Sequence, residues 1–221
     1  MKSTSNFLAF DLGAESGRAI LGSLTDGQIT LREVSRFATG MMMVHDHYRW
    51  NIYRFYEEMI KAIRQTVDLS ESPLSVGMDT WGVDFALFGE DGNMLDIPYC
   101  YRDSRTDGAM EDFFKLIPTD VVYRLNGIQF MQLNSLFQLF SMVRDHSPVL
   151  KQATDLLFIP YIFHYLLTGI KKTEFSYATT SQLYNPVKGA WEKELFDAMN
   201  LPVGLMQEIV SPGTRLGSIY S

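Results

Sequence analysis

An aspartate between two apolar runs is the first group in this chain that could do chemistry. Asp11 ends the apolar run 7–10, Gly13 and Gly17 flank the turn that follows, and a second apolar run starts at Ala19. Glycines permit backbone angles that other residues resist, so the pattern predicts two buried strands joined by a tight turn. A turn of this kind can aim several backbone N–H groups at one point and so bind an anion. We therefore predict a phosphate site, with Asp11 holding a metal ion beside the phosphate.

Ser16 and Arg18 offer further donors to an anion at this turn. The segment lacks the Gly-Lys-Ser/Thr of a Walker loop and the Gly-x-Gly-x-x-Gly of a dinucleotide site. An ordinary hairpin with a polar loop also explains the residues, so the turn by itself leaves both interpretations open.

A second group of chemically useful residues surrounds Trp81. Asp79, Thr80, Gly82 and Asp84 flank this tryptophan at the predicted end of a strand. Sugars bind to such groups, with ring C–H faces on an aromatic side chain and hydroxyls on carboxylates and amides. The alternative is a buried tryptophan among turn residues.

Two other polar segments invite a functional interpretation. Residues 101–107, Tyr-Arg-Asp-Ser-Arg-Thr-Asp, can form local ion pairs that hold a loop or can line a polar cleft. His45 and His47 suggest a metal site, but two histidines do not complete one. We expect no metal at these histidines.

The whole chain limits the class of protein. Its 221 residues are 46% hydrophobic, which is enough to bury a sizeable core. The net charge of −7 argues against nucleic acid as the main partner. The single cysteine, Cys100, excludes an internal disulfide and fits a reducing cytoplasm. No apolar run approaches membrane-spanning length and no signal peptide is recognisable, so we expect a cytoplasmic protein without a membrane partner.

These residues need a scaffold, and the apolar periodicity predicts an α/β fold with one sheet flanked by helices. Three strands open the chain as an antiparallel meander, and a helix capped by Asn51 packs on the sheet. The loop 41–47 separates the meander from that helix. The predicted strands are 7–12, 19–24, 28–37, 74–78 and 85–88, and the predicted helices are 52–67, 110–116, 119–125, 135–143, 161–167 and 191–199.

Five strings occur in an order and spacing that resemble the amino-terminal lobe of the FGGY carbohydrate kinases. The Trp-Gly-Val-Asp and Arg-Asp-Ser-Arg-Thr strings are more specific than the phosphate turn. The likeness runs from about residue 7 to residue 217. It implies an actin-like ATPase, ribonuclease-H-like lobe with a mixed sheet flanked by helices. The strings are 7–21, 79–84, 101–106, 127–130 and 178–183.

The resemblance also implies an activity and a set of site residues. Such kinases transfer the γ-phosphoryl of MgATP to a sugar hydroxyl, here O1 of the ketose L-rhamnulose. By position, Asp11 would lie near Mg²⁺, and Gly82 would leave space for the sugar. The ATP-binding set is Asp11, Gly13, Ala14, Glu15, Ser16, Gly17 and Arg18, and the sugar-binding set is Thr80, Trp81, Gly82, Asp84 and Asn134.

Two features depart from the family. Glu15 stands where many relatives have a small hydroxyl residue, and a carboxylate beside phosphates is unfavourable unless it points away or faces the metal. The aspartate that accepts the sugar proton lies, in the family, shortly after the position of Ser221, and a C-terminal kinase domain follows. We therefore expect residues 1–221 to be an N-terminal kinase domain, truncated before its catalytic base and inactive alone.

Other functions stay open at this stage. The sugar could be another ketose or polyol, such as xylulose, fuculose or glycerol, although the string at 81–84 argues against glycerol. A non-catalytic, actin-fold module that binds a sugar for regulation would explain the missing base directly. An actin-like assembly or chaperone ATPase shares only the phosphate turn.

Overall fold

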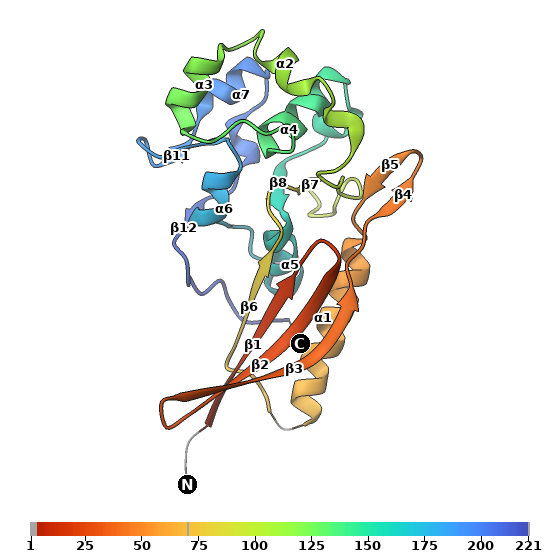
Figure 1. Cartoon of the computed structure of the whole chain (residues 1–221), viewed down its shortest axis with the longest axis vertical. Coiled ribbons are helices and arrows are strands. Elements are labelled where there is room, and N and C mark those ends of the chain that lie inside the picture. Colours follow the sequence, from red (N-terminus) through yellow and green to blue (C-terminus); the bar gives the residue numbers. More distant parts are fainter. Residues whose placement is uncertain (1–3, 70, 221) are drawn as a thin grey trace. The chain divides into compact units, whose positions relative to one another are not determined.

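The computed structural model describes residues 4–69 and 71–220. The chain folds into two compact units (Figure 1). The first unit comprises residues 1–42 and 50–81, and the second comprises residues 43–49 and 82–221. The expectation of one domain over residues 1–221 stays a prediction.

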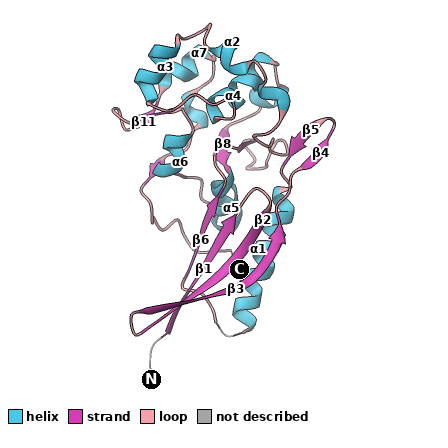
Figure 2. Ribbon diagram, viewed as in Figure 1, coloured by secondary structure: helices cyan, strands magenta, loops and turns pink. Residues whose placement is uncertain are grey.

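A four-stranded mixed sheet forms the first unit, with the strand order β3-β2-β1-β6 (Figure 2). β1, β2 and β3 pair antiparallel, which confirms the predicted meander. Asp26 and Gly27 join β2 to β3, both with positive φ, as a two-residue hairpin turn requires. The strands are β1 Thr4–Leu12, β2 Ser16–Thr25, β3 Gln28–Ala38 and β6 Ser75–Thr80.

The helix α1, Ile52–Asp68, packs against β2 and β3 of this sheet (Figure 1). Asn51 caps it, because its side chain accepts a hydrogen bond from the N–H of Arg54. The apolar face of α1 includes the buried Phe55 and Met59. β3 lies at one edge of this sheet, and its Ile29 is exposed, as the mixture of charged and apolar residues predicts.

β6 lies parallel to β1, and their register brings two chemically interesting segments together. Asp11 is registered with Asp79, and Leu12 with Thr80. The pairing extends beyond β6, since the N–H of Trp81 donates to the carbonyl of Leu12 at 3.2 Å. The phosphate turn and the start of the tryptophan segment therefore follow neighbouring strand ends within the first unit.

The second unit is mainly helical (Figure 2), and several phenylalanines lie in its buried core. β7 (Phe85–Phe88) and β8 (Asp155–Phe158) form an antiparallel pair. Phe113, Phe137 and Phe196 lie in the core around it. The helices are α2 Ala109–Phe113, α3 Thr119–Asn126, α4 Ser135–Arg144, α5 Ile159–Thr168, α6 Phe175–Thr180 and α7 Lys193–Ala198. Two short pairs join β9 (Thr173–Glu174) to β12 (Ile209–Val210) and β10 (Tyr184–Asn185) to β11 (Ala190–Trp191).

Two helices end in glycine caps. Gly127 follows α3 and Gly169 follows α5, both with left-handed backbone. The predicted start of the last helix at Trp191 is wrong, because Trp191 pairs with Tyr184 in β11. α7 instead begins after Glu192, whose side chain accepts from the N–H of the second residue beyond it.

The predicted loop 41–47 is also wrong, because most of it forms a hairpin. β4 (Met42–Val44) and β5 (His47–Arg49) are joined by His45 and Asp46, which have φ values of 48° and 64°. Positive φ at both central residues is the geometry of a type I′ turn. The usual Asn-Gly or Asp-Gly signal is absent, so the sequence pattern did not reveal the turn.

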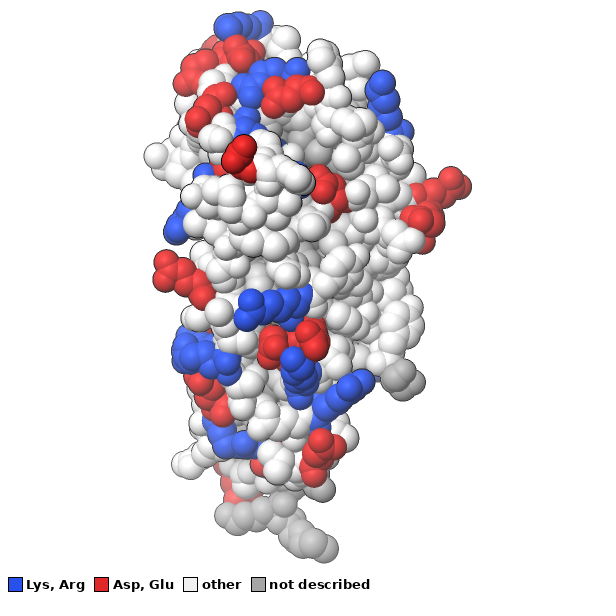
Figure 3. Space-filling model, turned by 90° about the vertical axis from the view of Figure 1, so that its right-hand side faces the viewer, with Lys and Arg blue, Asp and Glu red and all other residues white. Residues whose placement is uncertain are grey.

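Charged side chains of both signs are interspersed on the face shown in Figure 3, among the residues that the structure describes. No helix in this described part is long and apolar enough to cross a membrane.

Candidate functional site

The phosphate turn, residues 13–16, is closed by its own backbone and by the end of β3. The N–H of Gly13 donates to the carbonyl of Ser16 at 2.9 Å. Thr39 contacts the turn twice: its N–H donates to the carbonyl of Glu15 at 3.1 Å, and its hydroxyl donates to the carbonyl of Gly13. Three hydrogen bonds to backbone carbonyls thus hold the turn.

Position 17 has room only for a glycine. A Cβ at this position would lie 2.7 Å from the ring of Phe37 and 2.8 Å from Leu12. Neither Gly13 nor Gly17 has a positive φ, so the backbone freedom expected of them is not what the turn uses. The glycine at position 17 instead lets β1, β2 and β3 pack closely beneath the turn.

The tip of the phosphate turn presents free amides. Within the part of the chain that the structure describes, the N–H groups of Ala14 and Glu15 have no protein acceptor. Glu15 and Ser16 are exposed at the tip. Unsatisfied backbone donors at a turn are one part of an anion site, and the phosphate site stays a prediction.

Asp11 and Arg18 face each other across β1 and β2. Arg18 donates to the Oδ2 of Asp11 from Nε at 2.8 Å and from a terminal nitrogen at 2.6 Å. Both side chains are 44% exposed, so the pair can exchange partners with a ligand at low cost. No donor in the described residues contacts the Oδ1 of Asp11.

The donor set at Asp11 fits a Mg²⁺ ion that arrives with a nucleotide. Mg²⁺ prefers oxygen ligands and commonly binds one or two carboxylates together with substrate phosphates and water. In residues 4–69 and 71–220, no three His, Cys, Asp or Glu side chains form a metal-binding group. The protein would therefore supply few ligands, with Asp11 first among them.

Trp81 is held by aromatic neighbours in the first unit. Its ring lies 4.2 Å from that of Trp50 at an interplanar angle of 37°, and it meets Phe55 edge-on at 6.2 Å. Trp50 and Phe55 are fully buried, whereas Trp81 is half-buried. The tryptophan plate is thus fixed in orientation, as binding a sugar face would require.

The next three residues make an unusual turn. The N–H of Asp84 donates to the carbonyl of Gly82 at 2.9 Å, which closes a three-residue ring around Val83. Val83 has a φ of 69°, and a γ-turn with positive φ at its centre is rare and strained. A β-branched residue in this region is a genuine outlier. Gly82 itself is exposed, and a Cβ there would meet no described heavy atom within 4 Å.

Helix α4 supports this turn from inside the second unit. The hydroxyl of Ser135 donates to the carbonyl of Val83 at 2.6 Å, and the Nε2 of Gln138 donates to the Oδ1 of Asp84 at 2.9 Å. The N–H of Tyr101 donates to the other carboxylate oxygen of Asp84 at 3.2 Å. Asp84 is completely buried, so its carboxylate stabilises the turn from the interior of the unit.

Asn134 is also buried, at the start of α4. Its side-chain nitrogen donates to the carbonyl of Gln129 at 3.0 Å and to the Oε1 of Gln182 at 2.9 Å. In the described structure its side chain makes no capping bond to α4. A sugar contact by Asn134 stays a prediction.

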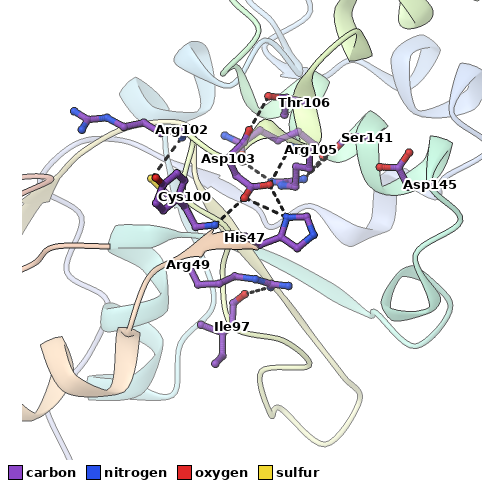
Figure 4. A network of polar contacts seen from close by, with 12 residues as sticks. His47, Arg49, Ile97, Cys100, Arg102, Asp103, Arg105, Thr106, Ser141 and Asp145 are labelled. Atoms are coloured by element: carbon purple, nitrogen blue, oxygen red, sulfur yellow. Dashed lines mark hydrogen bonds and ion pairs between the residues drawn. The ribbon is translucent and has the colours of Figure 1, made fainter. Parts of the chain in front are cut away.

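The polar segment 101–107 contributes a network of hydrogen bonds to distant residues, whereas local ion pairs were one of its two interpretations from the sequence (Figure 4). Asp103 is almost fully buried and accepts from the N–H of Tyr48 at 2.7 Å and from the N–H of Arg105 at 3.0 Å. The Nδ1 of His47 lies 3.1 Å from the same carboxylate. These bonds fasten the β4–β5 hairpin to the segment, and they explain His47 without a metal.

Arg105 extends the network to α4. One terminal nitrogen donates to the carbonyl of Gln138 at 2.7 Å and to the hydroxyl of Ser141 at 2.9 Å, and the other donates to the Oε1 of Gln138 at 2.7 Å. The guanidinium also stacks 4.2 Å from the ring centroid of Tyr99. Burial lowers the pKa of Arg105 to about 10, so it remains a cation at neutral pH.

Sequence reasoning placed the phosphate turn and the tryptophan segment but missed Ser135 and Gln138. Both are polar residues, three positions apart, in a helix that is otherwise mostly apolar. Residues at this spacing share one helix face. Buried polar side chains on one face need partners, and that was the signal that could have found them.

Comparison with known proteins identifies the family of the chain. Residues 6–221 match the model for the N-terminal domain of the FGGY family of carbohydrate kinases. The chain is 44% identical to a rhamnulokinase from Bacteroides thetaiotaomicron over 97% of its length, and 37% identical to one from Oceanobacillus iheyensis over 96%. It spans 44% and 45% of the lengths of these relatives.

The solved structures that resemble the chain share its fold at low sequence identity. A gluconate kinase from Lactobacillus acidophilus matches 99% of the chain with a TM-score of 0.85 at 15% identity. A xylulose kinase from the same organism matches 97% with a TM-score of 0.83 at 14% identity. The chain covers 44% of each of these proteins. These matches confirm the predicted α/β, actin-like fold, and the chain belongs to the FGGY family of carbohydrate kinases, matching its N-terminal domain.

Proposed function

We propose that this chain is the N-terminal lobe of an ATP-dependent kinase that phosphorylates a ketose, with L-rhamnulose converted to L-rhamnulose 1-phosphate. The observation that carries the proposal is the 44% identity to a rhamnulokinase across 97% of the chain. The xylulose and gluconate kinases are only 14% and 15% identical to it and support the fold alone.

The phosphate turn would bind the nucleotide phosphates. The free amides of Ala14 and Glu15 supply fixed donors, and Arg18 can turn from Asp11 to an incoming phosphate oxygen. Asp11 would hold Mg²⁺, which supplies neutralisation of phosphate charge when bound. Phosphoryl transfer depends mainly on positioning and on electrostatic stabilisation, and the rigid turn supports both.

The tryptophan segment would bind the ketose. Trp81 offers a fixed aromatic plate, Thr80 precedes it at the strand end, and Gly82 leaves room for the sugar. Asp84 and Asn134 are buried, so we propose that they shape this segment from inside.

None of these carboxylates is assigned as the general base. We propose that the carboxylate that accepts the sugar proton lies outside residues 1–221, in the remainder of a protein whose relatives are more than twice as long. The chain alone should accordingly bind ketose but show no phosphotransfer at ordinary kinase rates.

Gly82→Arg tests the sugar site. The arginine side chain should occupy the space proposed for the ketose and raise the dissociation constant for L-rhamnulose by about tenfold or more, a change of about 1.4 kcal/mol. Folding should be unaffected, because a Cβ at Gly82 meets no described atom within 4 Å and its φ is not positive. Isothermal titration calorimetry measures the binding, and the melting temperature checks the fold.

Gly77→Arg is a matched control, since its Cβ would also meet no described atom within 4 Å. Its ketose affinity should equal that of the wild type. If Gly82→Arg bound L-rhamnulose as tightly as the wild type, the proposed sugar site would be wrong.

A further inference from the structure

A buried amide in α4 lies between a cation and an anion of the second unit. The Oε1 of Gln138 accepts from Arg105 at 2.7 Å, and its Nε2 donates to Asp84 at 2.9 Å. Gln138 is 1% exposed and Asp84 is completely buried. The neutral amide thus connects the two charged groups by one hydrogen bond to each.

The chemistry of the two partners determines the orientation of that amide. A guanidinium can only donate and a carboxylate can only accept, so Oε1 must face Arg105 and Nε2 must face Asp84. Arg105 also bonds the backbone carbonyl of Gln138 and the hydroxyl of Ser141, which holds the guanidinium in place. Arg105 therefore holds the amide of Gln138 in one orientation.

On its other side, the amide of Gln138 bonds Asp84, which ends the strained turn at Val83. Such a sparsely populated backbone conformation is energetically unfavourable, and it persists only where the surroundings over-determine it. Gln138 fixes the carboxylate that follows Val83, and Ser135 fixes the carbonyl of Val83 itself at 2.6 Å. The turn in its observed form exposes Gly82.

We propose that Gln138 is a positioning residue for ketose binding: its amide, oriented by Arg105, holds Asp84 and thereby sets the Gly82–Asp84 turn. The inference rests on the proposed function, in that Gly82 is taken to meet the sugar. Gln138 does not touch the ketose, so its effect on affinity passes through Asp84 and the turn.

Gln138→Glu keeps the hydrogen bond to Arg105 and removes the one to Asp84. The new carboxylate still accepts from Arg105, but it removes the donor to Asp84 and to the carbonyl of Leu133, which Nε2 bonds at 2.8 Å, and it places two carboxylates next to each other. An unsatisfied buried acceptor is costly, so the dissociation constant for L-rhamnulose should rise by about tenfold or more. Gln152→Glu, at an exposed position of the same unit, makes the same chemical change and should leave the affinity unchanged.

The double variant Asp84→Asn/Gln138→Glu reverses the polarity of the bridge. The amide introduced at position 84 can donate to the carboxylate introduced at position 138 and still accept from the N–H of Tyr101. Part of the lost affinity should therefore return, although the carbonyl of Leu133 still lacks its donor, and Asp84→Asn alone should bind weakly. A general loss of packing would not be repaired in this way.

Calorimetry of the wild type and the variants decides between the outcomes. Unchanged affinity in Gln138→Glu, or loss without recovery in the double variant, would overturn the positioning role. If the wild type itself binds no ketose, the proposed function fails. The amide ¹H–¹⁵N shifts of Gly82 and Val83 then decide the inference, which predicts displacement in Gln138→Glu and return in the double variant. A single variant too unstable to titrate is judged by its melting temperature, which the second substitution should restore.

Discussion

At the residue scale, close packing and hydrogen bonds decide what each position of the site tolerates. Gly17 has no room for a side chain, whereas Gly77 of the same sheet has open space. Both glycines lie in strands without a positive φ. The pair therefore separates the effect of space from the effect of backbone entropy.

Gly17→Ala should lower the free energy of unfolding by about 1–3 kcal/mol, the usual cost of overpacking a core. Its Cβ would lie under 3 Å from Phe37 and Leu12, so the neighbours must shift. Chemical denaturation measures the change, and Gly77→Ala should be neutral or slightly stabilising. Equal stability of Gly17→Ala and the wild type would contradict the packing beneath the phosphate turn.

Sequence patterns revealed the phosphate turn better than the Val83 turn. The Asp-x-Gly string between apolar runs contains residue types that strand ends and turns favour. Val83 contains no such signal, because valine ordinarily favours extended backbone. Its positive φ arises from tertiary bonds by Ser135 and Gln138, which lie more than fifty residues away and which local propensity does not report.

At the element scale, buried polar bonds attach the β4–β5 hairpin to the segment 101–107. Asp103 accepts from two backbone amides and faces His47, and the N–H of Cys100 donates to the carbonyl of Tyr48 at 2.8 Å. The turn residues His45 and Asp46 gave no usual hairpin signal, so this element was predictable only in part. By contrast, α1 and the meander followed from periodicity and caps.

Asp103→Ala should loosen the hairpin without unfolding the sheet of the first unit. Removing the carboxylate leaves the Tyr48 and Arg105 amides without their acceptor, which costs about 1–3 kcal/mol for each buried group. Hydrogen exchange by NMR should become faster at both amides and stay unchanged in β1. Protection retained at Tyr48 would show that other contacts hold the hairpin.

The helix α5 contains a half-buried histidine, His164, that should make stability depend on pH. Burial lowers the pKa of His164 to about 4, and its Nδ1 has no partner in the described residues. The unfolded chain takes up the proton near pH 6.5, before the folded chain does, so stability should fall as the pH drops from about 6.5 to about 4. The loss from this group is at most about 3 kcal/mol.

Denaturation curves at a series of pH values test this effect. His164→Leu should lose less stability than the wild type between pH 6.5 and 4. His146→Asn is the control, because His146 is exposed and asparagine tolerates its positive φ. If the wild type and His164→Leu showed the same pH dependence, the histidine would not be the group that titrates.

At the scale of the whole molecule, the chain forms two compact units, each of which contains part of the proposed machinery. The phosphate turn and Trp81 belong to the first unit, and the turn at Val83 with its supporting helix α4 belongs to the second. The division was not predictable from composition, because no linker or change of composition marks residues 42–50 or 81–82. Packing between residues distant in the sequence defines it.

Recognition of a ketose by this lobe can be tested with a panel of candidate sugars. Calorimetric titration of the wild-type chain with L-rhamnulose, D-xylulose, L-fuculose and glycerol compares the four on one protein. We expect L-rhamnulose to bind most tightly, with a dissociation constant about tenfold or more below that of glycerol, which corresponds to about 1.4 kcal/mol. Binding of none of the four, or equal affinity for all of them, would contradict it.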